Sequence, residues 1–136
     1  MKEYELTFKG YWVEPNISAI PKTSGVYLVY RCIHEYDAVV LKDLIYIGQT
    51  YNLYDRIKSH EKKILFNKEC QAGETLCYSI AEVLQNDLDV VENSLIFAQK
   101  PKLNDQNKDS FNHQTPVNFL IEGKCGLLKY RKFTIK

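Results

Sequence analysis

The order of strand and helix patterns along this chain constrains its fold more than any other feature. Runs of β-branched and aromatic residues predict strands, and Asn or Asp ahead of an amphipathic segment predicts the start of a helix. The predicted elements are, in chain order, a strand at Val26–Ile33, a short strand at Leu44–Ile47, a helix from Asn52, a strand at Thr75–Val83 and a helix from Asp87 that Pro101 ends. We expect residues 1–136 to form one domain, because this length suits a single hydrophobic core.

Further elements are expected on either side of this series. Apolar and polar residues alternate over Tyr4–Phe8, which is typical of a half-buried strand. Val117–Ile121 and Leu127–Ile135 predict a closing β-hairpin. Residues 34–43 are predicted to connect two strands, and residues 105–116 are predicted to form a polar loop.

The predicted helix from Asn52 has an apolar face and a basic face. Spacings of three and four residues bring side chains together on a helix. The apolar face carries Leu53, Ile57 and Ile64, and the polar, basic face carries Arg56, His60 and Lys63.

Composition excludes several classes of protein. Hydrophobic residues make up 45% of the chain, charged residues 26%, and the mean hydropathy is −0.35, so no bilayer span and no membrane partner are expected. The first five residues carry acids and no apolar run, so we expect no secretory signal and a cytoplasmic location. The four cysteines form no Cys-x-x-Cys pair and are expected to be reduced and mostly buried.

Positive charge is concentrated in two segments. The net charge is +1 overall, but +3 over residues 51–68 and +4 over residues 106–136, with −5 between them. A nucleic-acid backbone would prefer a surface built from the two basic segments, and Lys58, Lys62 and Lys63 are candidate contacts. The alternative is two solvated, lysine-bearing surfaces without a nucleic-acid partner.

Glu92 is the strongest functional signal among the single residues. It shares an apolar stripe of the second predicted helix with Leu88, Val91, Leu95 and Ile96. An ionised carboxylate facing a core is costly unless it is paired or binds a cation. Glu92 is therefore a candidate metal ligand. The alternative places it at the edge of the stripe, where it reaches water or a lysine.

Arg56 and His60, one helical turn apart, could both reach a phosphate oxygen or an attacking water. Arginine offers a charged fork of donors that suits phosphate, and histidine can relay a proton near neutral pH. The alternative is that both side chains only lie on the solvent-exposed face of an amphipathic helix. Tyr27 and Tyr46 each lie in an apolar strand, where a core tyrosine with its hydroxyl at the rim is the ordinary interpretation.

The chain resembles the GIY-YIG nuclease family over residues 25–104. The matching residues are Gly25-Val26-Tyr27, Tyr46-Ile47-Gly48, Arg56, His60, Glu92 and Asn104. The chain also departs from the family pattern. Residues 28–45 separate the two motifs by more chain than is usual, so a loop inserted around His34–Asp43 is expected. Gln49 stands where many relatives have a basic residue, and a histidine like His60 occurs only in some branches.

The resemblance implies an α+β fold: a small central β-sheet of three main strands flanked by helices, which agrees with the predicted element order. Residues 1–24 and 105–136 would be extensions that add an N-terminal strand and a C-terminal hairpin. Gly25, Gly48 and Asn104 would have structural roles. The family includes repair, restriction and mobile-intron endonucleases.

The resemblance also implies metal-dependent hydrolysis of nucleic acid, DNA rather than RNA. Glu92 would hold one Mg²⁺ or Mn²⁺. Tyr27, helped by His60, would take a proton from the attacking water, Tyr46 would orient that water or the phosphate, and Arg56 would neutralise the charge. The alternatives are a binding module on the same fold without hydrolysis, and a protein-interaction subunit. Three options for specificity stay open: cleavage with little sequence preference, action as a homo-oligomer, and specificity supplied by a partner protein.

Overall fold

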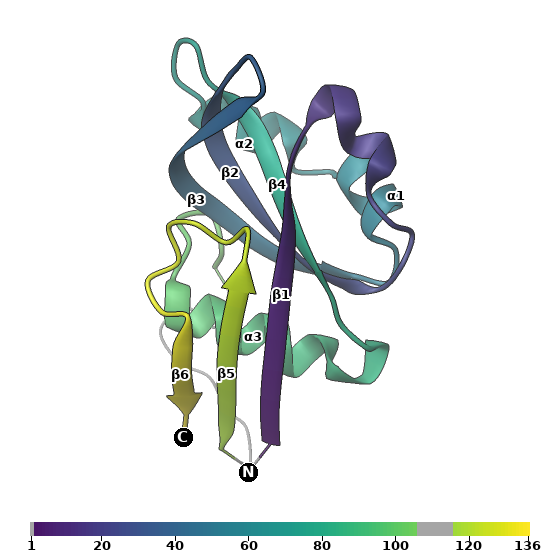
Figure 1. The fold of residues 1–136 in the computed structure, drawn as a ribbon, viewed down its shortest axis with the longest axis vertical. Coiled ribbons are helices and arrows are strands. Elements are labelled where there is room, and N and C mark those ends of the chain that lie inside the picture. The colour runs from purple at the N-terminus through teal and green to yellow at the C-terminus, as the bar shows by residue number, and fades with distance from the viewer. Residues whose placement is uncertain (1, 106–115) are drawn as a thin grey trace.

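The computed structural model describes residues 2–105 and 116–136 and has an α+β fold (Figure 1). Its elements are, in chain order, β1 (Lys2–Val13), the 3-10 helix η1 (Glu14–Ala19), β2 (Gly25–Glu35), β3 (Ala38–Thr50), α1 (Leu53–Lys58), α2 (Lys63–Glu69), β4 (Thr75–Glu82), the 3-10 helix η2 (Gln85–Asp87), α3 (Leu88–Gln99), β5 (Val117–Gly123) and β6 (Lys132–Ile135).

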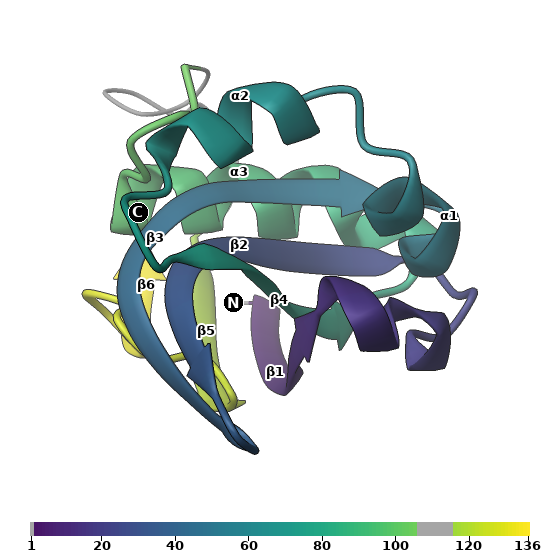
Figure 2. The same ribbon diagram turned by 90° about the horizontal axis from the view of Figure 1, so that it is seen from above.

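The strands form one curled, mixed sheet in the order β3-β2-β4-β1-β5-β6 (Figure 2). The described sheet therefore has six strands and not the three main strands expected. The pairs β3-β2, β2-β4, β4-β1 and β5-β6 are antiparallel, and β1-β5 is parallel. The N-terminal strand and the C-terminal hairpin are thus continuous with the rest of the sheet.

Both faces of the central strands are buried, because helices cover each face. On one face, Val26 and Leu28 of β2 belong to the apolar cluster that contains α3. On the other face, Tyr27 and Val29 belong to the cluster formed with α1, α2 and Ile20. The period of two along a strand sends neighbouring residues to opposite faces, so a nearly continuous apolar run fits β2.

The loop expected around His34–Asp43 is instead part of a long β-hairpin. β2 and β3 pair from Gly25 and Thr50 to Glu35 and Ala38, which leaves only Tyr36 and Asp37 in the turn. Many residues of this ribbon are exposed. The mixture of charged and apolar side chains in its sequence therefore does not indicate a buried strand.

The single helix expected from Asn52 is also wrong, because the chain forms two short helices. The capping prediction holds, since the Asn52 side chain accepts a hydrogen bond from the Asp55 N–H. However, α1 ends at Lys58 and α2 begins at Lys63. Ile64 is 75% exposed and does not continue the apolar face.

Other predictions are confirmed or adjusted. Leu6 and Phe8 of β1 are buried, as their alternation predicts, and the four cysteines are free. Asp87 lies at the N-cap of α3 but makes no capping hydrogen bond; its carboxylate accepts one from the Tyr4 hydroxyl. The second strand of the hairpin is shorter than predicted, and the predicted loop at 105–116 falls almost entirely outside the described residues. In the described part of the chain, no helix is long and apolar enough to cross a membrane.

Candidate functional site

The two motif tyrosines lie on adjacent strands and face the same side of the sheet. Tyr27 of β2 and Tyr46 of β3 have ring centroids 6.3 Å apart, and both side chains are buried. Gly48 lies directly opposite Tyr27 in the ladder. A Cβ at Gly48 would lie 2.2 Å from the Tyr27 hydroxyl oxygen, so this glycine makes room for the Tyr27 ring.

Gly25 has a comparable packing role. A Cβ there would lie 2.3 Å from the carbonyl oxygen of Ala81 on β4. The absence of a side chain therefore lets β2 and β4 pair closely at the end where the site forms.

His60 forms a short contact with Tyr27. Its Nε2 lies 2.7 Å from the Tyr27 hydroxyl oxygen, and its Nδ1 accepts a hydrogen bond from the Lys62 backbone N–H at 3.0 Å. Because Nδ1 is an acceptor, a neutral ring carries its proton on Nε2 and donates it to Tyr27. Burial, together with the charge of Arg56, lowers the pKa of His60 to about 4, so this neutral form is expected at physiological pH.

The break between α1 and α2 is what brings His60 inward. Residues 59–62 leave the helical path, and the His60 ring then packs 4.9 Å from the Phe66 ring and 5.7 Å from the Tyr46 ring, centroid to centroid. Phe66 also packs on Tyr46 at 5.1 Å. The two tyrosines, His60 and Phe66 form a closed aromatic cluster.

Arg56 on α1 connects this cluster with solvent. Its Nε donates to the Tyr27 hydroxyl oxygen at 3.4 Å, and a terminal nitrogen pairs with Glu61 at 3.3 Å. The Arg56 side chain is 30% exposed. Burial raises the pKa of Tyr27, and the hydrogen bond and charge of Arg56 oppose that rise. The Tyr27 oxygen therefore accepts from two donors, Arg56 and His60.

Glu92 is 7% exposed on α3, which packs along the edge strand β3. Its Oε1 accepts a hydrogen bond from the Gln49 side-chain amide at 3.0 Å, and the same nitrogen donates to Asp89 at 2.7 Å. Burial and the neighbouring Asp89 raise the pKa of Glu92, while Gln49 and Arg56 lower it.

The carboxylate of Glu92 lies within electrostatic range of the tyrosine pair. Its charge raises the pKa of both Tyr27 and Tyr46 and interacts with that of Arg56. No hydrogen bond among the described residues joins Glu92 to either phenol. The rings of Tyr27 and Tyr46 lie on the face that α1 and α2 cover, whereas α3, which carries Glu92, covers the opposite face of the sheet.

Two carboxylates accept hydrogen bonds from the side-chain amide of Gln49. Glu92 and Asp89 offer carboxylate oxygens one helical turn apart, and Mg²⁺ is commonly held by one or two carboxylates with water and substrate phosphate. Within residues 2–105 and 116–136, no group of three or more His, Cys, Asp or Glu side chains is placed to hold a metal ion. The sequence analysis missed Asp89 and the anchoring role of Gln49, although the spacing of three between Asp89 and Glu92 signals a shared helix face.

Asn104 has a structural role at the rim of the site. It is fully buried, and its amide makes two hydrogen bonds to Ile47: Oδ1 accepts from N–H at 2.9 Å and Nδ2 donates to C=O at 2.8 Å. Leu103 N–H also donates to Ile45 C=O. This segment therefore pairs with β3 between the two motif positions Tyr46 and Gly48.

The three candidate lysines lie in different surroundings. Lys58 lies over the Tyr54 ring at 5.6 Å, and Lys63 pairs with Glu14 at 3.1 Å. Only Lys62 lies over a motif tyrosine, with its Nζ 5.0 Å from the centroid of Tyr46. The structure thus separates Lys62 from the other two.

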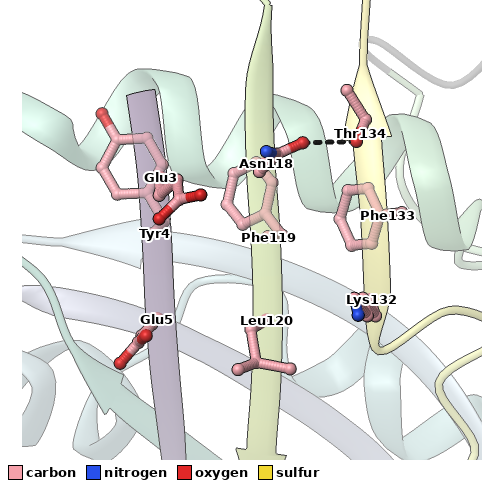
Figure 3. A pocket seen from close by; sticks show the side chains of 9 residues that line it. All are labelled: Glu3, Tyr4, Glu5, Asn118, Phe119, Leu120, Lys132, Phe133 and Thr134. Carbon is pink, nitrogen blue, oxygen red and sulfur yellow. Dashed lines mark hydrogen bonds between the residues drawn. The ribbon is translucent and has the colours of Figure 1, made fainter. Parts of the chain in front are cut away.

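A cavity of about 520 Å³ lies on the other half of the sheet, over β1, β5 and β6 (Figure 3). Glu3, Glu5, Leu120 and Lys132 line it, together with the strand segments that carry the stacked rings of Tyr4, Phe119 and Phe133. None of its lining residues belongs to the motif set, so this cavity is separate from the candidate site.

Comparison with known proteins gives no identification. No protein-family model matches the chain, and no curated protein or solved structure matches it significantly.

Proposed function

We propose that the protein is a metal-dependent endonuclease of the GIY-YIG type that hydrolyses DNA phosphodiester bonds. The observation that best supports this proposal is the Tyr27 hydroxyl oxygen, which lies within hydrogen-bonding distance of Arg56 and His60. Glu92 lies on α3, at the opposite face of the sheet, and acts on Tyr27 through its charge. In this proposal, the β3-β2-β4 part of the sheet, with α1 and α3, corresponds to the family core.

The two donors at Tyr27 give its oxygen the environment of a general base. Hydrogen bonds to a charged form favour that form, so Arg56 and the Nε2–H of His60 act against the burial that, on balance, raises the pKa of Tyr27. A bound divalent ion would have to lower that pKa further before Tyr27 could act as a base near neutral pH. His60 acts here as a donor to Tyr27, because its Nδ1 is already occupied by the Lys62 N–H. The Tyr27 phenolate would take a proton from the attacking water, and Tyr46 would orient that water.

Arg56 would bind the scissile phosphate through its exposed terminal nitrogens. Its present partner, Glu61, is 71% exposed at the side chain, and an exposed ion pair of this kind contributes about 1 kcal/mol or less. A phosphate can therefore displace Glu61 at low cost and gain charge-assisted hydrogen bonds from the guanidinium.

Glu92, assisted by Asp89, would hold Mg²⁺ or Mn²⁺. When bound, the ion supplies positive charge to the phosphate oxygens in the transition state. Gln49 holds both carboxylates in place through one amide nitrogen. By the same resemblance, the products would carry a 5′-phosphate and a 3′-hydroxyl.

The test is cleavage of linear, nicked and branched DNA with Mg²⁺ or Mn²⁺. We expect Glu92→Gln and Arg56→Gln each to lower the single-turnover rate at least 100-fold, because each removes a charge that acts on the phosphate. Glu82→Gln is the matched control for Glu92, since Glu82 is an exposed residue at the end of β4. Equal cutting by the parent and both site variants would refute the proposed site.

A second candidate function is DNA binding without hydrolysis. The observation that favours it is the 1% exposure of Tyr27, which leaves little of the phenol open to substrate. This alternative predicts salt-sensitive binding that needs no divalent ion, with no cleavage in any of the substrates.

A further inference from the structure

The segment between β5 and β6 lies beside the C-terminal end of α3 (Figure 1), and one buried side chain holds it there. Gln99 of α3 is 3% exposed. Its side-chain amide makes two hydrogen bonds to the backbone of Tyr130: Oε1 accepts from the N–H at 3.0 Å, and Nε2 donates to the carbonyl oxygen at 2.5 Å. The backbone of Tyr130 is therefore fixed at both of its polar groups.

The side chain of Tyr130 contributes little to the core in return. Tyr130 is 55% exposed, so its ring supplies only part of the stability that a buried ring would give. A buried amide is costly unless it is hydrogen-bonded, and here that amide fixes a residue whose ring stays in solvent. This arrangement favours binding of a ligand at the ring, because the backbone that carries the ring is already ordered.

Positive charge surrounds Tyr130. Its neighbours in the chain are Lys129, Arg131 and Lys132, and all three are exposed. Arg131 donates to the carbonyl oxygen of Cys125 at 3.3 Å. None of the three cations forms an ion pair within the part of the chain that the structure describes. Proteins that hold single-stranded nucleic acid combine such cations, which bind phosphates, with an exposed aromatic ring on which a base stacks.

Helical spacing places Tyr130 on the same side of α3 as Glu92. Gln99 follows Glu92 by seven residues, or two turns, and side chains at this spacing lie on one side of a helix. Two turns span about 10.5 Å along the axis, which is about three nucleotide steps along one strand of B-form DNA. A DNA strand that reaches Glu92 can therefore also reach Tyr130.

We propose that residues 129–131 bind DNA that contains unpaired nucleotides, with one base stacked on the Tyr130 ring and phosphates held by Lys129 and Arg131. Inside a duplex the bases stack on one another, so only an unpaired base offers a free face to the ring. This inference rests on the proposed function, and it names the substrate class as DNA with single-stranded segments.

The competing explanation is that Gln99 only positions the chain for β6, and that the Tyr130 ring has no ligand. Tyr130→Ala keeps the backbone N–H and C=O, so both hydrogen bonds to Gln99 are retained. The competing explanation therefore predicts, for Tyr130→Ala, a small loss in the free energy of unfolding and no change in DNA binding.

The test measures binding of fluorescent oligothymidylate and of a long duplex by anisotropy in EDTA, so that no cleavage occurs. We expect Tyr130→Ala to lower the affinity for oligothymidylate about tenfold, as for one lost stack between a base and an aromatic ring, and to leave the affinity for the duplex unchanged. Tyr130→Phe should keep the parent affinity for both, because the ring is retained.

Tyr36→Ala is the matched control for Tyr130→Ala, since Tyr36 is 97% exposed in the turn between β2 and β3. It should bind oligothymidylate as the parent does. Lys129→Gln should reduce the slope of log K against log salt by about 0.7, the value for one phosphate of a single strand. Lys9→Gln, which removes an exposed lysine on β1, should keep that slope.

The outcomes separate this inference from the proposed function. Unchanged affinity for oligothymidylate in Tyr130→Ala overturns the stack at Tyr130, even if the parent cleaves DNA. An equal loss in Tyr130→Phe also overturns it, since the ring is then not the contact. A selective loss in Tyr130→Ala, in a protein that never cleaves DNA, supports the inference and refutes the nuclease proposal. Absence of DNA binding by the parent overturns both.

Discussion

At the scale of single residues, His60 shows how packing determines a chemical state. Its ring is 6% exposed, accepts at Nδ1 and contacts Tyr27 at Nε2. A histidine on a helix surface would titrate near pKa ~6.5, but burial and Arg56 lower the pKa of His60 to about 4. The side chain that sequence reasoning assigned to proton relay therefore acts as a neutral donor.

This state predicts a pH dependence of folding stability. Between about pH 6.5 and pH 4 the unfolded chain binds a proton at His60 and the folded chain does not. The contribution of His60 to the free energy of unfolding is therefore fully present above about pH 6.5 and is lost as the pH falls through about 4. We expect it to reach about 2–3 kcal/mol, measured by urea unfolding from pH 4 to 8.

His60→Gln is the control for this measurement, because glutamine has no titrating group. The free energy of unfolding of His60→Gln should therefore fall less than that of the parent as the pH is lowered over that range. A constant difference between the parent and His60→Gln from pH 4 to 8 would contradict the assignment.

At the scale of elements, the segment after α3 supports strand β3 at the candidate site. The side-chain amide of Asn104 makes two hydrogen bonds to the backbone of Ile47, between Tyr46 and Gly48. Asn104→Ala would leave a buried N–H and C=O without partners, so we expect a loss of about 2–4 kcal/mol in the free energy of unfolding.

Asn86→Ala in η2 is a suitable comparison for this substitution, because it removes the same amide from an exposed residue outside the β3 segment. A loss of stability in Asn104→Ala no larger than in Asn86→Ala, measured by urea unfolding at pH 7, would contradict the structural role of Asn104.

The sequence predicts elements well where a periodic pattern coincides with a core. The runs in β2 and β4 and the stripe of α3 are of this kind. The long hairpin is missed because exposed residues in its outer half carry no burial signal. The helix break after Lys58 is missed because the helical spacing continues to Ile64, whereas the contact that draws His60 inward comes from Tyr27 on a distant strand.

At the scale of the whole molecule, the two halves of the sheet carry different features. The β3-β2-β4 half carries the tyrosine pair, with Arg56 on α1 packed beside it. The β1-β5-β6 half carries the separate cavity (Figure 3). Folding brings Arg56 and His60 to the tyrosine pair on one face of the sheet, whereas Glu92 lies on α3 at the opposite face. The partners of each motif residue could not be predicted, because they depend on contacts between distant elements.

The most direct measurement of the central claim is the single-turnover cleavage rate of Tyr27→Phe. This substitution removes only the oxygen at which Arg56 and His60 converge. The matched control is Tyr30→Phe, which removes a buried hydroxyl on the same strand that donates to the Gly126 carbonyl. We predict that Tyr27→Phe loses about 10²–10⁴-fold in rate, as for a lost general base, while Tyr30→Phe retains the parent rate. A Tyr27→Phe variant that cuts as fast as the parent would contradict the account.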